Sequence, residues 1–517
     1  MSQLNATLLS DINGSTDVQT SAEKKGPSKH ARLTSLDIVR GYTIAMMIFV
    51  DDVGDAYPHV NHSPWNDITL ADHVMPWFLF MVGTSMAFSF RKFKVNRETR
   101  IEGTKFALKR AVKLYLLGVM LQGGSWFGGV RFYGKASHRD GPSWDLSTIR
   151  YCGILNRIGF AYAVVAMFEL WLPEQTQCAR KMSSPHLKMF ANTGYKWLGA
   201  FVFMAIYLLM VLFTWVPTWK SYYRWDHAPN GSNPCEASQV YVPEGFDIVC
   251  DNYGYETIIG VKDGTPECSA IGVYDRLFFT QQHLGTWMST RSEHCSSQSP
   301  ARCPKLGAPA WCGAMIYDPE GFLATINTIM SCWIGLYFGL VVKNSELSSP
   351  KARLTHWLSF AGLLMFVGLI MHFTTFMPMN KQEWSVSYVF FMAGSCGAAL
   401  AVVYYLVDVK NGLQQYCASF FRPFQYMGMN AILVFFYHGT AEYILNSVYV
   451  TPGKNQVNPD PPLEEHSILT FLHDTICGGI VGGEKKPEAQ LLYVLFKISG
   501  FLGLAWYLHK IKYFWKV

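Results

Sequence analysis

Charged side chains are scarce in this sequence. They make up 15% of its 517 residues, against about 25% in ordinary soluble proteins. Hydrophobic residues reach 50%, and the net charge is only +6. Because apolar residues dominate and charges are few, the composition favours a membrane protein with sizeable polar loops over a soluble domain.

Several motifs are also missing. No basic block with interleaved aromatic residues indicates nucleic-acid binding. Neither a Walker sequence nor a dinucleotide-binding fingerprint is present, and GGSWFGG at 123–129 is only a glycine-rich loop. Residues 1–32 are polar and lack the apolar core of a signal peptide. We therefore expect a disordered cytosolic tail there, followed by a first span that serves as a signal anchor.

The sequence does contain long apolar runs, each about the 20 residues that a bilayer requires. We expect an all-α polytopic membrane protein with about ten transmembrane helices and one large exoplasmic loop containing disulfides. The expected spans are 34–53, 69–90, 105–123, 151–172, 194–216, 317–342, 354–377, 384–407, 424–447 and 488–510.

Lysine and arginine residues give the expected orientation. They concentrate in alternate connections between the spans, and such connections are cytosolic by the positive-inside rule. Both termini are then cytosolic, 33–517 is the membrane domain, and 217–316 is an exoplasmic insertion. One exoplasmic connection fits poorly, because residues 124–150 carry four basic side chains: Arg131, Lys135, Arg139 and Arg150. They belong either to a tolerated charged loop or to a site for an anionic acceptor.

The exoplasmic insertion holds six of the twelve cysteines: Cys235, Cys250, Cys268, Cys295, Cys303 and Cys312. Cysteines in a polar exoplasmic loop favour disulfides, although the spacing does not choose among the pairings. Zinc is the competing hypothesis, but no CxxC pair supports it. Asn230 starts a possible glycosylation motif in the same loop.

A cluster of histidines and aspartates between the first two spans, Asp51–Pro76, is the main candidate site. His62 has the residue type of a general base or an acyl acceptor near neutral pH. Either Asp51 or Asp72 can hold its imidazole by a hydrogen bond. The alternatives are a solvated loop with charges at helix ends, or a zinc site that includes His59 and His73.

Polar residues in or near other spans are secondary candidates. Asp318 and Glu320 either cap a helix start or contact substrate. Arg157 requires an anionic partner inside the bilayer. Asn430 and His438 either line a binding cavity or make structural hydrogen bonds, and Arg40 faces lipid headgroups or the phosphates of a cytosolic cofactor.

Seven segments, taken together and in order, resemble the family of heparan-α-glucosaminide N-acetyltransferases. They are LDIVRG at 36–41, HSPWNDITLADHVMPWFLFMVG at 62–83, RYCGILNRI at 150–158, YDPEGFLATINTI at 317–329, MNKQEWSVSY at 379–388, VDVK at 407–410 and GMNAILVFFYH at 428–438. FVDDVGDAYP at 49–58 is closer to plant-type members, which implies a homologue without the lumenal N-terminal domain of the animal enzyme.

The resemblance implies an N-acetyltransferase that moves acetyl from cytosolic acetyl-CoA to an amino sugar on the lumenal side. It assigns the active histidine to His62 and the aspartate of the family's ADxxxP motif to Asp72. Asp51 stands where the animal enzyme has asparagine. From the residue types and their positions we also expect two groups of contacts. The cofactor would touch Arg157, Arg40, Asn430 and His438, and the substrate would touch Trp65, Asn66, Asp318 and Glu320.

The implied partners are glycan and small-molecule substrates and membrane lipids, with no nucleic acid and possible homodimers. The implied location is a lysosomal, vacuolar or other endomembrane. Two alternatives remain open. A secondary transporter also has about ten spans and polar residues inside the membrane. A non-catalytic sugar-binding membrane protein is the other. Residues alone also leave open whether His62 deprotonates the acceptor or carries acetyl covalently.

Overall fold

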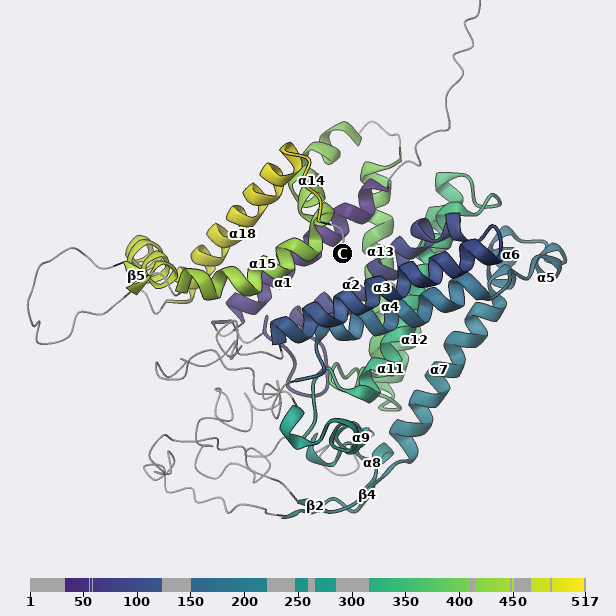
Figure 1. The fold of residues 1–517 in the computed structure, drawn as a ribbon, viewed down its shortest axis with the longest axis horizontal. Helices are drawn as coiled ribbons and strands as arrows, with labels where there is room; N and C mark the ends of the chain where they lie inside the picture. The colour runs from purple at the N-terminus through teal and green to yellow at the C-terminus, as the bar shows by residue number, and fades with distance from the viewer. Residues whose placement is uncertain are drawn as a thin grey trace, which may run out of the picture. The chain divides into compact units, whose positions relative to one another are not determined.

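Helices make up nearly all the regular structure in the described part of the chain (Figure 1). The computed structural model describes residues 33–54, 56–57, 59–122, 150–220, 247–258, 266–284, 316–409, 414–446, 449–450, 466–483 and 486–515. The long helices are α1 (Thr34–Val53), α2 (Val74–Ser89), α3 (Arg97–Gln122), α4 (Ile154–Trp171), α7 (Gly194–Phe213), α11 (Phe322–Lys343), α12 (Pro350–Phe373), α13 (Val386–Val407), α14 (Gln414–Met429), α15 (Ala431–Asn446) and α18 (Pro487–Lys510).

Short elements connect these helices. The helical ones are η1 (Ala71–His73), η2 (Arg91–Phe93), α5 (Thr176–Arg180), α6 (Pro185–Asn192), α8 (Gly254–Ile258), η5 (Pro266–Cys268), α9 (Ala270–Phe279), η6 (Gln281–His283), α16 (Ile468–Thr470), the π-helical η8 (Phe471–Cys477) and α17 (Gly478–Val481). The strands pair in antiparallel twos: β1 (Trp215–Val216) with β4 (Asn252–Tyr253), β2 (Trp219–Lys220) with β3 (Asp247–Ile248), and β5 (Tyr449–Val450) with β6 (His466–Ser467).

Each of the ten predicted spans contains a helix, which confirms an all-α membrane fold. Six helices in the described residues are long and apolar enough to cross a bilayer: α4, α7, α11, α12, α13 and α18. The other predicted spans have visible reasons for falling outside this group. Helix α1 carries four charged residues, α2 has only 16 residues, α3 is rich in charge, and the ninth span is divided between α14 and α15.

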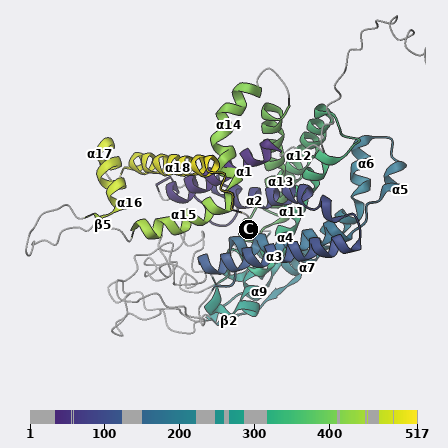
Figure 2. The same cartoon turned by 45° about the horizontal axis from the view of Figure 1, so that its top comes forward.

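Close helix pairs build the bundle (Figures 1 and 2). Helix α2 lies along α11, α3 along α4, α12 along α13, and α1 along α14. The α2–α11 crossing depends on glycine, because a Cβ added at Gly83 would lie 1.8 Å from the carbonyl oxygen of Cys332. A Cβ added at Gly335 would lie 1.9 Å from that of Phe80. Small residues at such crossings let membrane helices approach backbone to backbone.

The candidate site lies at one side of the bundle, where several long helices begin or end. The chain leaves α1 at Val53 and enters α2 at Val74, while α4, α11 and α13 all begin at this side. Ser385 caps α13 by accepting a hydrogen bond from the backbone N–H of Tyr388. These are the helix ends that the sequence places on the exoplasmic side.

The predicted disulfide loop is partly described. Cys250 and Cys268 form a disulfide that joins the segment after β3 to η5, which confirms a disulfide in this insertion. The remaining four cysteines of the predicted set, and Asn230, lie outside the described residues. So do residues 1–32 and the basic side chains Arg131, Lys135 and Arg139.

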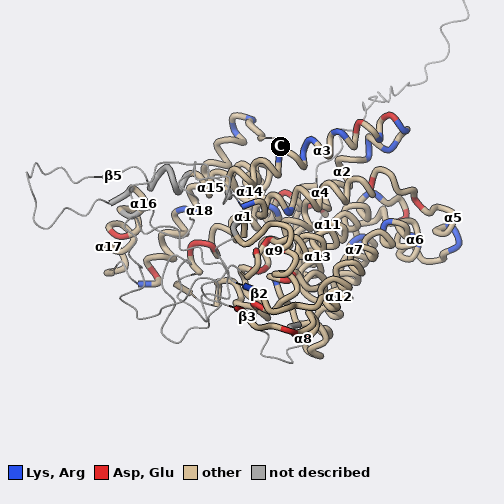
Figure 3. Tube along the Cα trace, turned by 60° about the horizontal axis from the view of Figure 1, so that its bottom comes forward, with Lys and Arg blue, Asp and Glu red and all other residues tan. Residues whose placement is uncertain are grey.

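Basic side chains gather at η2, along α3 and around α5 and α6, as the blue segments in Figure 3 show. They include Arg91, Lys92, Lys94, Arg97, Arg100, Arg180 and Lys181. These residues lie at the ends of α2, α4 and α7 opposite to the helix ends that carry the candidate site.

Candidate functional site

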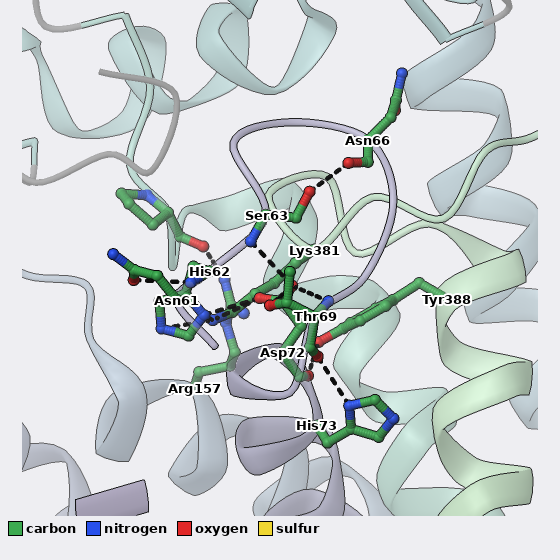
Figure 4. Close-up of polar contacts among 11 residues, drawn as sticks. Asn61, His62, Ser63, Asn66, Thr69, Asp72, His73, Arg157, Lys381 and Tyr388 are labelled. Carbon is green, nitrogen blue, oxygen red and sulfur yellow. Dashed lines mark hydrogen bonds and ion pairs between the residues drawn. The ribbon is translucent and has the colours of Figure 1, made fainter. Parts of the chain in front are cut away.

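His62 lies in the connection between α1 and η1, against the buried carboxylate of Asp72 (Figure 4). Its Nδ1 is 2.8 Å from Oδ1 of Asp72. Backbone hydrogen bonds fold this connection back on the bundle, including one from the N–H of Ala71 to the carbonyl oxygen of Val60. The two residues that the sequence singled out, ten positions apart, are therefore direct partners.

The other oxygen of Asp72 holds the loop itself. Its Oδ2 accepts hydrogen bonds from the backbone N–H groups of Ser63 at 3.1 Å and Thr69 at 3.0 Å, and from the Thr69 hydroxyl at 3.0 Å. The hydroxyl of Tyr388 donates to the backbone carbonyl of Asp72 at 2.6 Å. With one oxygen on the imidazole and one on the loop, Asp72 fixes both the ring and the backbone that carries it.

Lys381, in the turn before α13, is the third member of the group. Its Nζ lies 2.8 Å from Nδ1 of His62, 3.2 Å from Nε2 and 3.5 Å from Oδ1 of Asp72. If Nδ1 donates its proton to Asp72, the lone pair of the neutral ring is on Nε2. Lys381 was absent from the predicted site residues, although it lies in the MNKQEWSVSY segment that carries the family resemblance.

The charges around His62 oppose each other. Burial lowers the pKa of His62, and the positive charge of Lys381 lowers it further. The hydrogen bond and charge of Asp72, and the charge of Glu320, act in the other direction without reversing the shift. Burial alone would raise the pKa of Asp72, but Lys381 and the His62 hydrogen bond outweigh it and hold that pKa far below its ordinary value. The favoured state is a neutral imidazole beside an ionised carboxylate and an ammonium.

A second charged group borders the first. Arg150 donates from Nε to Oδ2 of Asp318 at 2.8 Å and from a terminal nitrogen to Oδ1 at 2.5 Å, and it also pairs with Glu320. Asp318 is buried. The one described basic residue of the loop that fitted the orientation rule poorly thus has two carboxylate partners. This gives its charge a structural explanation that the sequence did not suggest.

Arg157, buried at the start of α4, approaches the same region. One terminal nitrogen donates to the carbonyl oxygen of Pro319 at 2.8 Å, and the guanidinium lies 4.7 Å from the centre of the Trp384 ring. Its buried Nε has no acceptor among the described residues. Because an unused buried donor is unfavourable, this nitrogen suits an acceptor supplied by a bound substrate or by water.

Trp65 and Asn66, the two predicted substrate contacts next to His62, face other elements. The Trp65 ring lies 5.6 Å from that of Tyr317. Asn66 forms a backbone bridge with Asn380, whose amide donates to Oδ1 of Asn66 at 3.4 Å. Since Asn380 precedes Lys381, this bridge ties the His62 loop to the turn that presents the lysine.

The remaining predicted site residues are Asp51, His438, Asn430 and Arg40, and each has other partners. Asp51 lies near His438, whose Nε2 is 3.9 Å from its Oδ2, and the carboxylate hydrogen-bonded to Nδ1 of His62 is that of Asp72. Asn430 donates to the carbonyl oxygen of Tyr513 and accepts from the N–H of Trp515. Arg40 donates to Asp37 within α1 at 3.3 Å.

His59 and His73, the other two histidines of the alternative zinc hypothesis, have different surroundings. His73 donates from Nδ1 to the carbonyl oxygen of Thr69 at 3.0 Å, and its ring packs edge-on against Trp77. His59 is exposed. Over the described ranges, no cluster of three or more histidine, cysteine or acidic side chains has the arrangement of a metal site.

Comparison with known proteins finds similarity to N-acetyltransferases. Residues 32–216 match the family described as "Heparan-alpha-glucosaminide N-acetyltransferase, catalytic". Two relatives carry the name heparan-alpha-glucosaminide N-acetyltransferase. The one from Mus musculus is 27% identical over 495 residues, covering 94% of this chain and 60% of the relative. The one from Homo sapiens is 29% identical over 419 residues, covering 80% and 53%.

The chain is similar to the heparan-alpha-glucosaminide N-acetyltransferase family over residues 32–216, and to the two relatives of that name over most of its own length. It spans less than two thirds of the length of these two relatives. The stretch matched by the N-acetyltransferase family includes the His62–Asp72 pair, Arg150 and Arg157, whereas Lys381 and the Asp318–Glu320 pair lie beyond it.

Proposed function

We propose that this protein is a transmembrane acetyltransferase that uses acetyl-CoA from the cytosol and acetylates an amino sugar, of the glucosamine type, on the lumenal side. The observation that carries the proposal is the partly buried His62–Asp72 pair, at 2.8 Å, in a chain similar to an N-acetyltransferase family. Asp72 orients the imidazole and stabilises its protonated form when that form appears during reaction.

His62 supplies the proton acceptor. The acceptor nitrogen attacks the thioester carbonyl carbon, so that an N–C bond forms and the C–S bond breaks. Nε2 takes the proton from the attacking amine and returns one to the departing thiolate of coenzyme A. In the covalent alternative Nε2 itself attacks the carbonyl, and the acetyl-imidazole then passes acetyl to the amine.

The charged groups near the pair fit the two substrates in different ways. Asp318 and Glu320 present carboxylates, although Arg150 already neutralises part of their charge. The unused Nε of Arg157 can donate to a carbonyl or an anionic oxygen of either substrate. Acetyl-CoA carries phosphates that cannot cross the bilayer core, so a reaction linking the two sides requires a site at which the thioester reaches His62.

The test is acetyl transfer from labelled acetyl-CoA to glucosamine by purified protein. We expect His62→Ala to lower the rate by about 100-fold or more, with an unchanged thermal unfolding curve. His59→Ala is the matched control, since His59 is an exposed histidine in the same connection.

Three outcomes decide the proposal. A folded His62→Ala variant that transfers acetyl at the wild-type rate removes His62 from the reaction. Wild-type protein that neither binds acetyl-CoA nor transfers acetyl contradicts the acetyltransferase function and favours a transporter. An acetylated His62 trapped with acetyl-CoA alone, together with ping-pong kinetics, selects the covalent route.

A further inference from the structure

The turn before α13 places the ammonium group of Lys381 next to the imidazole of His62. Lys381 Nζ lies within 3.2 Å of both ring nitrogens, although 319 residues separate the two side chains in sequence. The lysine side chain is 15% exposed, so little water screens its charge. Figure 4 shows Lys381 and Asp72 converging on the imidazole, with Arg157 close by.

The backbone of this turn is held in an unfavourable conformation. Trp384 has φ 55°, in the left-handed region that bulky residues rarely adopt. The indole is fully buried and donates to Ser331, while the Trp384 carbonyl accepts from Asn327 at 2.5 Å. A residue stays in such a conformation only when its surroundings enforce it.

Further contacts fix the lysine end of the turn. Asn380 bridges to Asn66 in the His62 loop and accepts from the backbone N–H of Glu383 at 2.8 Å. The N–H of Trp384 donates to the carbonyl oxygen of Lys381 itself. The turn and the loop therefore hold Lys381 and His62 against each other as one unit.

Among the described residues, other charged or titratable groups near the imidazole come from η1, α4, α13 and the segment before α11. Asp72 in η1 and Glu320 before α11 are negative and favour an imidazolium. Arg157 in α4 is positive but already engages Pro319 and the Trp384 ring, and Tyr388 in α13 is used by the Asp72 backbone. Lys381 places its ammonium nitrogen within hydrogen-bond distance of the ring.

We propose that Lys381 is a positioning residue of the His62 site, whose ammonium keeps the imidazole neutral, and so able to accept a proton, despite the two carboxylates around it. This inference rests on the proposed function for its role in acetyl transfer. Without Lys381, Asp72 and Glu320 would leave His62 protonated over a wider pH range, and a protonated imidazole can neither deprotonate an amine nor attack a thioester.

The test measures the protonation of His62 directly. Diethyl pyrocarbonate reacts with neutral imidazole, and mass spectrometry of the peptide containing His62 gives the extent of modification at each pH. We expect Lys381→Met to raise the midpoint of this reaction by about one pH unit or more, the usual effect of a charge at this distance. The acid limb of the transfer rate should shift in the same direction and by a similar amount.

Two variants separate charge from structure. Lys381→Arg keeps the positive charge and should leave the midpoint near the wild-type value, although a guanidinium can lower the maximal rate. Lys486→Met removes an exposed lysine elsewhere in the chain and should change neither midpoint nor rate. If thermal unfolding shows that Lys381→Met does not fold, Lys381→Gln removes the same charge and retains a hydrogen-bonding end.

A midpoint that is unchanged or lower in a folded charge-removing variant overturns the inference. Failure of the proposed function is a separate result. If the wild-type protein transfers no acetyl, the modification midpoint of His62 can still differ between wild type and Lys381→Met. Loss of transfer without any shift would indicate that Lys381 serves only the structure of the turn.

Discussion

Glu383 is a buried carboxyl group two residues beyond Lys381, and it connects the turn to the disulfide-bonded insertion. Its Oε1 accepts a hydrogen bond from the Ser269 hydroxyl at 2.6 Å. Burial raises the pKa of Glu383 to about 7, an effect that the Ser269 hydrogen bond only partly offsets. Asp275, also buried, has its pKa raised to about 7 by burial and by the charge of Asp318.

These raised values predict how stability depends on pH. Between about pH 4.5 and 7 the folded protein keeps these carboxyl groups protonated while the unfolded chain loses the protons, so stability falls as pH rises. For Glu383 the loss is on the order of 3 kcal/mol across this window. Glu383→Gln should flatten the fall, as measured by thermal unfolding in detergent between pH 4.5 and 7.5.

In Glu383→Gln, titration of Asp275 still makes stability fall with pH. The decisive comparison is therefore how large this fall is in the variant and in the wild type. Glu98→Gln, which changes an exposed glutamate of α3, should retain the full wild-type fall. A Glu383→Gln protein with the same fall as wild type would show that Glu383 is ionised throughout the window.

Residue types and a local family motif were enough to select His62 and to name Asp51 and Asp72 as its candidate partners. They left Asp51 as an equal candidate, because sequence distance does not tell which of two helix-end aspartates turns toward a loop. Lys381 and Arg150 were missed for a different reason. Their partners are 319 and 168 residues away, respectively, and a lysine or arginine near a membrane surface has an ordinary explanation in lipid contact.

Packing of individual helices shows how much the bundle depends on small residues. The α2–α11 crossing brings Gly83 against the Cys332 carbonyl and Gly335 against that of Phe80. Helix α2 begins one residue after η1, which contains Asp72. A displacement of α2 therefore reaches the carboxylate that holds His62.

Gly83→Val should destabilise the protein by about 1–3 kcal/mol or more, because the added carbons overlap backbone atoms of α11. The thermal unfolding midpoint and the acetyl-transfer rate should both fall. Gly362→Val in α12 is the matched control, since nothing lies within 4 Å of a Cβ at that position. Equal midpoints for the two variants would contradict the tight crossing.

At the level of elements, apolar runs of the right length predicted all ten helical segments. The break in the ninth was not predicted, because Asn430 resembles an ordinary polar residue inside a span. Its amide instead binds the backbone of Tyr513 and Trp515 beyond α18, a partner that no local pattern reveals. The α11 start at Phe322 also depends on a distant group, since Asp275 accepts the N–H groups of Asp318 and Phe322.

Considered as a whole, the membrane domain has clusters of lysine and arginine at one set of helix ends and the candidate site at the other. Cys178, an exposed cysteine in α5, lies among the basic residues that the positive-inside rule places in the cytosol. His62 and the Cys250–Cys268 disulfide belong to the opposite set of ends.

A membrane-impermeant maleimide should therefore label Cys178 only when it has access to the cytosolic face of sealed vesicles. Cys178→Ser identifies the signal that belongs to this residue. Labelling of Cys178 from the exoplasmic face of intact vesicles would reverse the orientation, and with it the side on which the acceptor is used.

The double use of Asp72 has a consequence for genetics. One oxygen serves the imidazole and the other closes the loop through backbone N–H groups of Ser63 and Thr69. Inherited variants in this stretch then do not divide into folding alleles and catalytic alleles by position. A proline at 63 or 69, which deletes a backbone donor, belongs to the same class of allele as a change at Asp72 itself. Substitutions that keep the N–H groups form a milder series.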